Sequence, residues 1–273
     1  MKSRDVIPGV FSRHAAAYQR RLDQIMERGE ARGRQRVIDL VEPRPGMRIL
    51  DLACGPGTLT RRLAELVAPD GEVIGVDLAE GMLELARAAA IPNARFELMD
   101  ISRLAFPDGS FDAVTCGHGL QFVPDLGQAL RESRRVLRAR APFAASFPAD
   151  SSGRSPATVV QEVVDRLLPP SPKVTDRGET QRTVGDASLL RDASASAGFA
   201  DARVEIVEEK VRWESAAQYV AMLMSWWDCA ARMEGVEPQR LRAFQQEATS
   251  ALRDAYPGSF ETTARNHVLF GRA

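Results

Sequence analysis

Two kinds of hydrophobic pattern alternate along the middle of the chain. Short apolar runs have the length of buried strands, and between several of them apolar residues recur at the three- and four-residue steps of a helix. The predicted strands are 47–53, 72–77, 94–99, 111–117 and 141–148, and the predicted helices are 58–67, 80–90 and 125–138. Because parallel strands need crossover connections, this alternation predicts an α/β fold with a parallel sheet and helices on both faces.

The flanking segments are predicted to be mainly helical. Residues 11–41 carry two apolar stripes at helical spacing, and the turn sequence PRPGMR at 43–48 separates them from the sheet. After the last of these strands, the chain changes character over 149–183, which is predicted to be an insertion containing the helical segment VVQEVVDRLL. The remaining predicted elements are a helix at 186–197, a strand at 202–211, two helices within 214–256 and a last strand at 266–272.

The stretch ILDLACGPGTLT at 49–60 joins a predicted strand to a predicted helix through small residues. Asp51 lies near the strand end, and Ala53, Gly55 and Gly57 lie at the turn. Small residues let the backbone approach a ligand, and the N–H groups at a helix start attract its polar parts. The second strand, VIGVD, ends at Asp77, twenty residues after Gly57. A doubly wound fold places a ribose-binding carboxylate at about this distance.

Several polar or small residues fall at the carboxyl ends of predicted strands. They are Asp51, Gly55, Asp77, Asp100 and His118. Ligands of open parallel sheets bind outside these strand ends, so the five residues are predicted to share one site.

Five segments in this order resemble the class I S-adenosylmethionine-dependent methyltransferases, particularly the group with the ubiquinone and menaquinone C-methyltransferases. The segments are the loop at 49–60, VIGVD at 73–77, FELMDIS at 96–102, LAFPDGSFDAVTCGHGLQFVPD at 104–125 and ALRESRRVLR at 129–138. The resemblance implies a Rossmann-like, doubly wound, seven-stranded sheet with an antiparallel last strand and helical cap elements. Two departures are Ala139–Ala141, where relatives have Pro-Gly-Gly, and Ala53, where many have glycine.

The resemblance also implies S-adenosylmethionine as the cofactor and a set of residues that bind it. Asp77 would bind the ribose hydroxyls, Asp100 and Ile101 would flank the adenine, and Gly117 would lie below the methionine portion. Tyr18 would face the cofactor, although packing in a helical core is the alternative for this ring. The full implied set is Tyr18, Asp51, Ala53, Gly55, Gly57, Asp77, Leu78, Met82, Asp100, Ile101 and Gly117.

The implied organisation is a core with helical additions. Its parts are an N-terminal cap (1–45), the cofactor-binding core (46–148), the insertion (149–183), a continuation of the core (184–212), a helical substrate cap (213–257) and the last strand (258–273). The first helical segment and 214–256 are predicted to form a lid. Aromatic and methionine residues concentrated in 214–256 either line an apolar substrate pocket or pack as the core of the cap.

His118 is the predicted catalytic residue. S-adenosylmethionine transfers its methyl group by in-line displacement, so the enzyme mainly has to align the acceptor with the methyl carbon. An oxygen, protonated nitrogen or carbon acceptor must also lose a proton, and a histidine with a pKa of about 6.5 can take it. The alternative is a histidine that hydrogen-bonds the substrate or the backbone. His14, in the predicted lid, is a second and weaker candidate for the base.

Composition and missing motifs narrow the substrate to a small, apolar molecule. The formal net charge is -1, which favours neither nucleic acid nor an anionic membrane as a partner. CGHGL at 116–120 stands where methylases of amide or base amino groups carry Asn-Pro-Pro-Tyr. The arginines between 13 and 36 are interleaved with acidic residues, which is typical of a solvated helix face. The sequence leaves the acceptor atom and the oligomeric state open.

The sequence predicts neither a membrane segment nor a metal site. No apolar run approaches the ~18 residues that span a bilayer, and MKSRDVIPG has no apolar core for a secretion signal, so a cytoplasmic location is predicted. Cys54, Cys116 and Cys229 are widely spaced, which argues against a disulfide framework or a zinc site. Two other functions stay open: a cyclisation or rearrangement on the same fold, and a regulatory protein that binds the cofactor.

Overall fold

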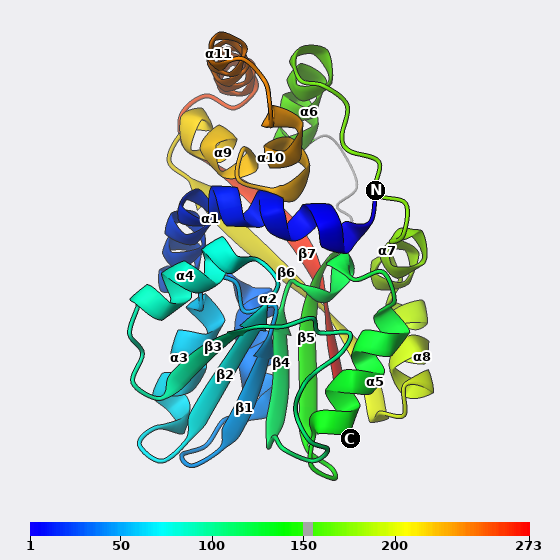
Figure 1. The fold of residues 1–273 in the computed structure, drawn as a ribbon. Helices are drawn as coiled ribbons and strands as arrows, with labels where there is room; N and C mark the ends of the chain where they lie inside the picture. Colours follow the sequence, from blue (N-terminus) through cyan, green and yellow to red (C-terminus); the bar gives the residue numbers. More distant parts are fainter. Residues whose placement is uncertain (150–154) are drawn as a thin grey trace.

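The computed structural model describes residues 1–149 and 155–273. The predicted insertion at 149–183 is therefore described only in part, because 150–154 lie outside these residues. The described chain builds a central sheet with helices on both faces and a further layer of helices beyond one end of the sheet (Figure 1). None of the described helices is both long and apolar enough to cross a membrane.

The sheet has seven strands in the order β3-β2-β1-β4-β5-β7-β6. Their bounds are β1 Arg48–Leu52, β2 Glu72–Asp77, β3 Ala94–Leu98, β4 Ala113–Gly117, β5 Pro142–Ala149, β6 Ala200–Trp213 and β7 Phe260–Arg272. β7 runs antiparallel to both of its neighbours, β5 and β6. This arrangement confirms the predicted Rossmann-like, doubly wound α/β fold with an antiparallel last strand.

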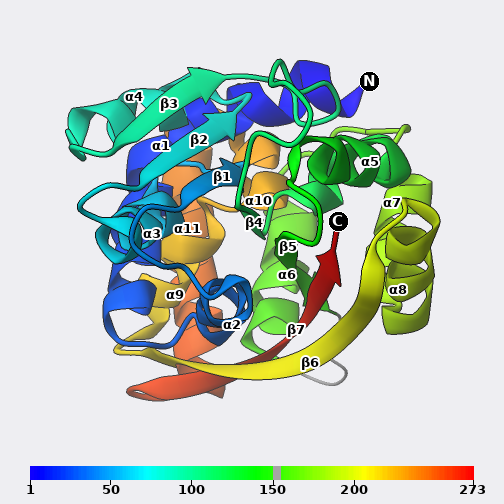
Figure 2. The same ribbon diagram turned by 90° about the horizontal axis from the view of Figure 1, so that it is seen from below.

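β6 and β7 are longer than predicted, and together they form a twisted ribbon at one edge of the sheet (Figure 2). Their pairing continues out to Trp213 opposite Phe260. The inner half of β7 is continuously buried, whereas residues in the outer half alternate between exposed and partly buried. The apolar run at 266–272 therefore marked only the half of the strand that lies inside the sheet.

The helices match the predicted periodicity closely within the sheet region and less closely outside it. Their bounds are α1 Ser3–Glu27, α2 Arg32–Val41, α3 Thr58–Val67, α4 Glu80–Ala88, α5 Leu126–Val136, α6 Pro156–Leu167, α7 Gly178–Gly185, α8 Ala187–Ser196, α9 Ala216–Leu223, α10 Trp227–Met233 and α11 Pro238–Ala255. A short 3-10 turn, η1, covers Leu120–Phe122. The prediction of two helices within 214–256 was wrong, because this segment contains three helices, α9, α10 and α11. α9 ends early, and just after it the Ser225 hydroxyl donates to the Met222 carbonyl at 2.6 Å.

α1 also begins eight residues earlier than predicted. The carboxylate of Asp176 accepts the Ser3 backbone N–H at 3.0 and 3.1 Å, so the first turn of α1 is capped by a residue from a distant loop. A free backbone N–H at a helix start is costly when buried, and such a cap satisfies it. Local periodicity could not indicate this start.

Apolar residues on the two sheet faces pack under different helices. Leu50 and Leu52 face α5 and α8, whereas Ile49 and Val73 face α2 and α3 (Figure 2). A third cluster joins α6, α9, α10 and α11 to the outer ends of β6 and β7, and Phe244 of α11 is fully buried in it. We call this third cluster, together with its helices, the helical cap.

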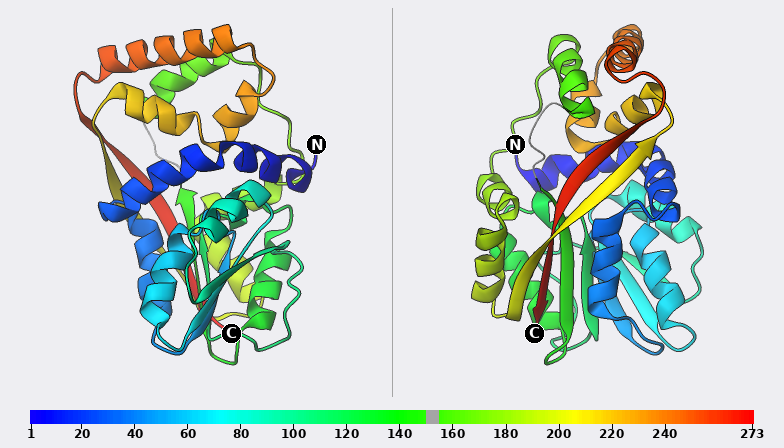
Figure 3. Two further views of the ribbon diagram at one scale, coloured as in Figure 1. Left: turned by 60° about the vertical axis from the view of Figure 1, so that its left-hand side comes forward. Right: turned by 180° about the vertical axis from the view of Figure 1, so that it is seen from behind.

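α1 lies between the carboxyl end of the sheet and the helical cap, as Figures 1 and 3 show. It approaches α4 closely, since a Cβ added at Gly81 would lie 2.5 Å from the Ser12 carbonyl oxygen. On the other side, Val10 packs against Ala230 and Ala231 of α10. α1 is thus buried on two faces, and its position depends on both layers.

Replacing Phe244 with alanine should destabilise the protein strongly. The side chain is fully buried in the cap core, so Phe244→Ala would lose apolar burial and leave a cavity, at a cost of about 3 to 5 kcal/mol. Urea unfolding measures the change, and Gln246→Ala, at an exposed position of the same helix, is the matched control. A loss for Phe244→Ala no larger than that of the control would contradict the packed cap.

Candidate cofactor and active site

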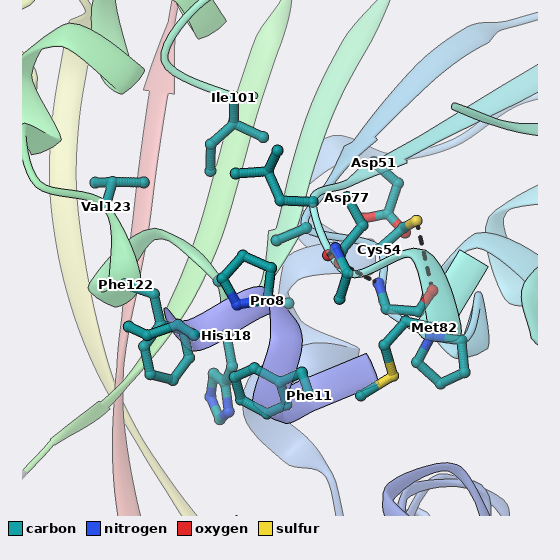
Figure 4. Close-up of a pocket in the computed structure, with 18 of the residues that line it drawn as sticks. Pro8, Phe11, Asp51, Cys54, Asp77, Met82, Ile101, His118, Phe122 and Val123 are labelled. Atoms are coloured by element: carbon teal, nitrogen blue, oxygen red, sulfur yellow. Dashed lines mark hydrogen bonds between the residues drawn. The ribbon is translucent and has the colours of Figure 1, made fainter. Parts of the chain in front are cut away.

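A cavity opens at the carboxyl ends of β1, β2 and β4, beneath α1 (Figure 4). All of the residues implied by the sequence except Gly57 line it: Tyr18, Asp51, Ala53, Gly55, Asp77, Leu78, Met82, Asp100, Ile101, Gly117 and His118. The cavity is also lined by residues that the sequence analysis did not select, including Arg4, Pro8, Phe11, Arg34, Phe122 and Val123. The strand-end segments that carry the family resemblance therefore line one cavity.

Asp77, at the end of β2, fastens the loop after β1. One carboxylate oxygen accepts the Gly55 N–H at 2.8 Å, and the other accepts the Ala79 N–H at 2.8 Å. Burial raises the pKa of Asp77, and these N–H donors oppose the rise by stabilising the carboxylate. A carboxylate has about four acceptor positions, so Asp77 retains capacity for a pair of ligand hydroxyls.

The two loop glycines have different environments. Gly55 has a φ of 56°, and a Cβ built on it would meet nothing within 4 Å, so the backbone presents an open surface. Gly57 has a φ of 79°, but a Cβ there would lie 3.0 Å from the Phe96 ring and 3.3 Å from Ala86. Gly57 is therefore required by helix and strand packing, and the structure places it outside the cavity lining.

Ala53, the other departure from the glycine-rich pattern, adopts the left-handed backbone conformation with a φ of 49°. Alanine pays only a modest conformational penalty there. The neighbouring loop makes room for the Ala53 methyl group because it has a glycine there. A Cβ on Gly119 would lie 2.2 Å from the Ala53 Cβ. The loop thus keeps its turn without the usual glycine.

Asp51 is fully buried beneath the loop. Its oxygens accept the hydroxyls of Thr60 at 2.6 Å and Thr115 at 2.9 Å. Burial raises the pKa of Asp51 to about 6, against the opposing effect of these hydroxyls. The residue therefore ties β1 to α3 and β4 at the floor of the cavity.

Asp100 follows β3 and also lines the cavity. One oxygen accepts the Ser102 N–H at 2.8 Å, and the other lies 3.5 Å from the guanidinium of Arg4 in α1. Ile101 beside it is only 7% exposed. The start of α1 thus lies close to the residues that the family resemblance assigns to adenine.

His118 follows β4 in a left-handed conformation with a φ of 67°. Its N–H donates to the Ser146 carbonyl at 3.2 Å, while its Nε2 atom is buried and has no hydrogen-bond partner among the described residues. The ring lies in the part of the cavity that holds Phe11 and Phe122 (Figure 4).

The expectation of an ordinary histidine pKa was wrong. Burial lowers the pKa of His118 well below 6.5, and the positive charge of Arg34 lowers it further, although the Asn266 amide opposes this. The imidazole is therefore neutral near neutral pH, which is the form that accepts a proton. His14, the second candidate base, lies outside this cavity, in a groove that includes Ala17, Met224 and Leu241.

Two of the arginines assigned to a solvated helix face are buried. Arg21 is 5% exposed and Arg34 is 8% exposed. Arg34 lines the cavity and donates to the Tyr18 hydroxyl at 3.3 Å. Arg21 lies over the Trp213 ring, 4.1 Å from its centroid, and Arg34 lies against Tyr18. Charge patterning within one helix carries no signal of such contacts with distant segments.

The aromatic and methionine residues of 214–256 do not line the cavity. Tyr219, Met222, Met233 and Phe244 instead pack in the helical cap, as the second sequence interpretation proposed. Trp226 is 42% exposed. The apolar wall of the cavity comes from α1 and η1, where Phe11 and Phe122 have ring centroids 5.4 Å apart. The spacing of Phe11 and Tyr18 on one helical stripe was a usable signal for this wall.

Residues 49–140 match the model of the methyltransferase domain family. Nocamycin O-methyltransferase from Saccharothrix syringae is 32% identical over 233 residues, which cover 80% of this chain and 82% of the relative. The 2-phytyl-1,4-naphtoquinone methyltransferase from Synechococcus elongatus is 36% identical over 49% of this chain and 60% of its own length. A demethylmenaquinone methyltransferase from Staphylococcus aureus is 43% identical over 38% of this chain and 44% of its own length. The chain thus spans less than two thirds of both quinone methyltransferases.

Solved structures share the fold at low sequence identity. A methyltransferase-like protein from Bacillus halodurans superposes with a TM-score of 0.54 at 17% identity, covering 88% of this chain and 97% of that one. The cyclase SpnF superposes with a TM-score of 0.51 at 19% identity, covering 89% and 80%. These similarities concern the fold alone.

The match to nocamycin O-methyltransferase over most of both chains, together with the family model, shows that the chain belongs to the class I S-adenosylmethionine-dependent methyltransferases. Its cofactor is S-adenosylmethionine. The cavity fits this molecule, because Gly55 offers open backbone and Asp77 offers acceptor positions at the strand ends.

Asp77→Ala should weaken binding of S-adenosylhomocysteine by roughly tenfold to over a hundredfold. The change removes a charged acceptor for ribose hydroxyls, worth about 1.5 to 3 kcal/mol, and also releases the Gly55 and Ala79 amides. Calorimetry measures the affinity, with Asp70→Ala, at an exposed turn before β2, as the control. Equal affinities for Asp77→Ala and the wild type would refute the role of Asp77.

Proposed function

We propose that the chain transfers a methyl group from S-adenosylmethionine to an oxygen, nitrogen or carbon of a small, apolar molecule, and that His118 accepts the proton that the acceptor loses. The observation that carries this proposal is the buried, unpaired Nε2 of His118 in the cavity that also contains Asp77 and Gly55. Because the His118 residue lines the cavity, an acceptor bound beside the cofactor would lie next to it.

The chain's own residues contribute mainly position and exclusion of water. When bound, S-adenosylmethionine supplies an electrophilic methyl group. α1 covers the strand ends, and Ile7, Phe11 and Phe122 provide an apolar surface on which a flat or aliphatic molecule can rest. His118 is neutral because burial lowers its pKa, so it can take the acceptor's proton without first losing one.

Two further observations support a small, apolar acceptor. The relatives are named for nocamycin, a phytyl naphthoquinone and demethylmenaquinone. The formal net charge of -1 provides no general attraction for nucleic acid. Because the match to the O-methyltransferase covers 80% of this chain, an oxygen acceptor is the first to test.

We also propose that α1 acts as a lid and that the part of the helical cap within 213–257 supports it from behind. α1 supplies Ile7, Phe11, Tyr18 and Leu22 to the cavity wall and packs on α10 through Val10. A ligand in the cavity would therefore contact α1 directly and the helical cap only through α1. The two segments predicted to form one lid would therefore have different roles, because α1 covers the ligand and residues 213–257 support α1.

His118→Ala should slow single-turnover methyl transfer by about 10² to 10⁴, the usual contribution of a general base, while leaving the affinity for S-adenosylhomocysteine nearly unchanged. His14→Ala, in the same helix as Phe11 but outside the cavity, is the matched control and should retain the wild-type rate. The rate constant is measured by rapid quench at saturating acceptor. A His118→Ala variant with the wild-type rate would show that alignment alone drives the reaction.

The pH profile gives a second test of His118. Since the pKa of His118 lies well below 6.5, the neutral base predominates at and above that pH. The wild-type rate should therefore stay level above pH 6.5 and decline only at more acidic pH, as the imidazole is protonated. A wild-type rate that rises through pH 6.5 to 7.5, or a decline in acid that persists in His118→Ala, would exclude this assignment.

S-adenosylhomocysteine should slow amide hydrogen exchange in α1, most of all between Ser3 and Leu22. These residues include the cavity wall, so a bound ligand adds contacts that oppose local opening. Residues 214–256 should be protected less, because they reach the ligand only through α1. Unchanged exchange in α1 would contradict its role as a lid.

A further inference from the structure

Asn266 of β7 is a buried amide next to α2. Its side chain is only 1% exposed. A Cβ built on Gly33 of α2 would lie 2.9 Å from Cγ and 3.0 Å from Nδ2 of Asn266, so α2 packs directly on the amide. Its Nδ2 atom is buried and has no hydrogen-bond partner among the described residues. Burying an amide without partners is unfavourable, and a leucine would fill this place without that cost.

The register of the sheet places Asn266 near His118. Gly117, the last residue of β4, pairs with Ser146 of β5, and the Ser146 carbonyl accepts the His118 N–H at 3.2 Å. Val268 of β7 lies opposite Ser146, and Asn266 is the next residue on the same face, toward the carboxyl end of β5. This face is the one that packs under α2. The backbone of His118 and the side chain of Asn266 therefore meet at one corner of the sheet.

The Asn266 amide is the partner available to the His118 ring. A neutral imidazole has one N–H and one lone pair, and the partner of the N–H sets which nitrogen carries the proton. Nε2 of His118 has no hydrogen-bond partner among the described residues. Hydrogen bonding to Asn266 opposes the fall in the pKa of His118, which is the effect of an acceptor on a ring N–H. With Nε2 free, the nitrogen left for the amide is Nδ1.

We infer that Asn266 is a positioning residue for His118: its amide oxygen accepts the Nδ1–H of the imidazole and keeps the lone pair on Nε2 for the acceptor's proton. The inference rests on the proposed function of His118 as the base. An amide suits this task because it orients the ring without bringing a negative charge that would stabilise the imidazolium. The ring thus stays neutral and in one tautomer.

One charged group acts on the His118 ring within the described structure. It is Arg34 of α2, whose positive charge lowers the pKa of His118. Glu209 of β6 also lies at this corner, where it accepts the Gly33 N–H at 3.2 Å. The other titratable side chains that line the cavity are Arg4, Tyr18, Asp51, Cys54, Asp77 and Asp100.

The tautomer of His118 is measured by heteronuclear NMR of protein labelled at its histidine rings, near neutral pH and without ligand. The signals of His118 are those that disappear in His118→Ala. The wild type should carry the proton on Nδ1. Asn266→Leu should give a mixture of both tautomers and slow single-turnover methyl transfer by about tenfold to a hundredfold. Its affinity for S-adenosylhomocysteine should stay within about twofold of the wild type.

Asn266→Asp should raise the pKa of His118, because a carboxylate beside the ring stabilises the imidazolium. The NMR titration midpoint of His118 should move up by about one to three pH units, and the acidic decline of the methyl-transfer rate should move with it. Thr263→Asp is the matched control, because it adds the same charge at an exposed position of the same strand. It should leave the titration and the rate profile unchanged.

Gly33→Ala disturbs the Asn266 amide without changing either partner. Alanine favours a helix, but its methyl group would meet the Asn266 side chain, so this variant should also give mixed tautomers. Gly178→Ala, at the start of α7, is the control, because a Cβ there would meet nothing within 4 Å.

Three results would each overturn the inference. They are a wild-type His118 with its proton on Nε2, a tautomer unchanged in both Asn266→Leu and Gly33→Ala, and a titration midpoint that does not move in Asn266→Asp. The wild-type measurement decides even if a variant fails to fold. If the NMR results are as expected but His118→Ala keeps the wild-type rate, the hydrogen bond is confirmed and only the role of His118 as base fails.

Discussion

The two hydrogen bonds that the Asp77 carboxylate accepts hold the site together. They join the amide of Gly55, in the loop after β1, to the amide of Ala79, at the start of α4. Two loops from neighbouring strands are thus fixed by one side chain at the end of β2. The cost is a buried carboxylate with a raised pKa, which the amide donors reduce. Asp77 also lines the cavity, so the group that fixes the two loops is the one proposed to bind the cofactor.

α1 depends on this arrangement and in turn shapes the cavity. Its Ser12 contacts Gly81 in α4, which follows directly from the segment that Asp77 fixes. One face of α1 closes the cavity with Phe11 and Tyr18, and the other packs on the helical cap through Val10. A helix buried on both sides has little freedom to move independently. The position of α1 therefore depends on the helical cap as well as on the sheet.

Burial and a neighbouring positive charge set the pKa values of Asp51 and His118 in the cavity. Asp51 has a pKa raised to about 6 by burial, and His118 has a pKa lowered by burial and by Arg34. The Arg34 guanidinium lines the same cavity, and its positive charge lowers the pKa of Asp51 as well as that of His118. A neutral histidine in this cavity suits an acceptor that has a proton to lose.

The sheet, its connections and the strand-end residues that line the cavity could be predicted from the amino-acid sequence, because these follow from apolar periodicity and from backbone turns encoded within a few residues. Helix 58–67 and strand 72–77 have the predicted bounds for this reason. The folded structure was needed to show which face of α1 lines the cavity and that Gly57 packs against Phe96. It was also needed to show that Arg34 is buried while Arg36 pairs with Glu205. It also separated His14 from His118 and placed the aromatic residues of 214–256 in the helical cap. These outcomes depend on contacts between segments far apart in the chain, and local patterns carry no information about the partner that a side chain meets.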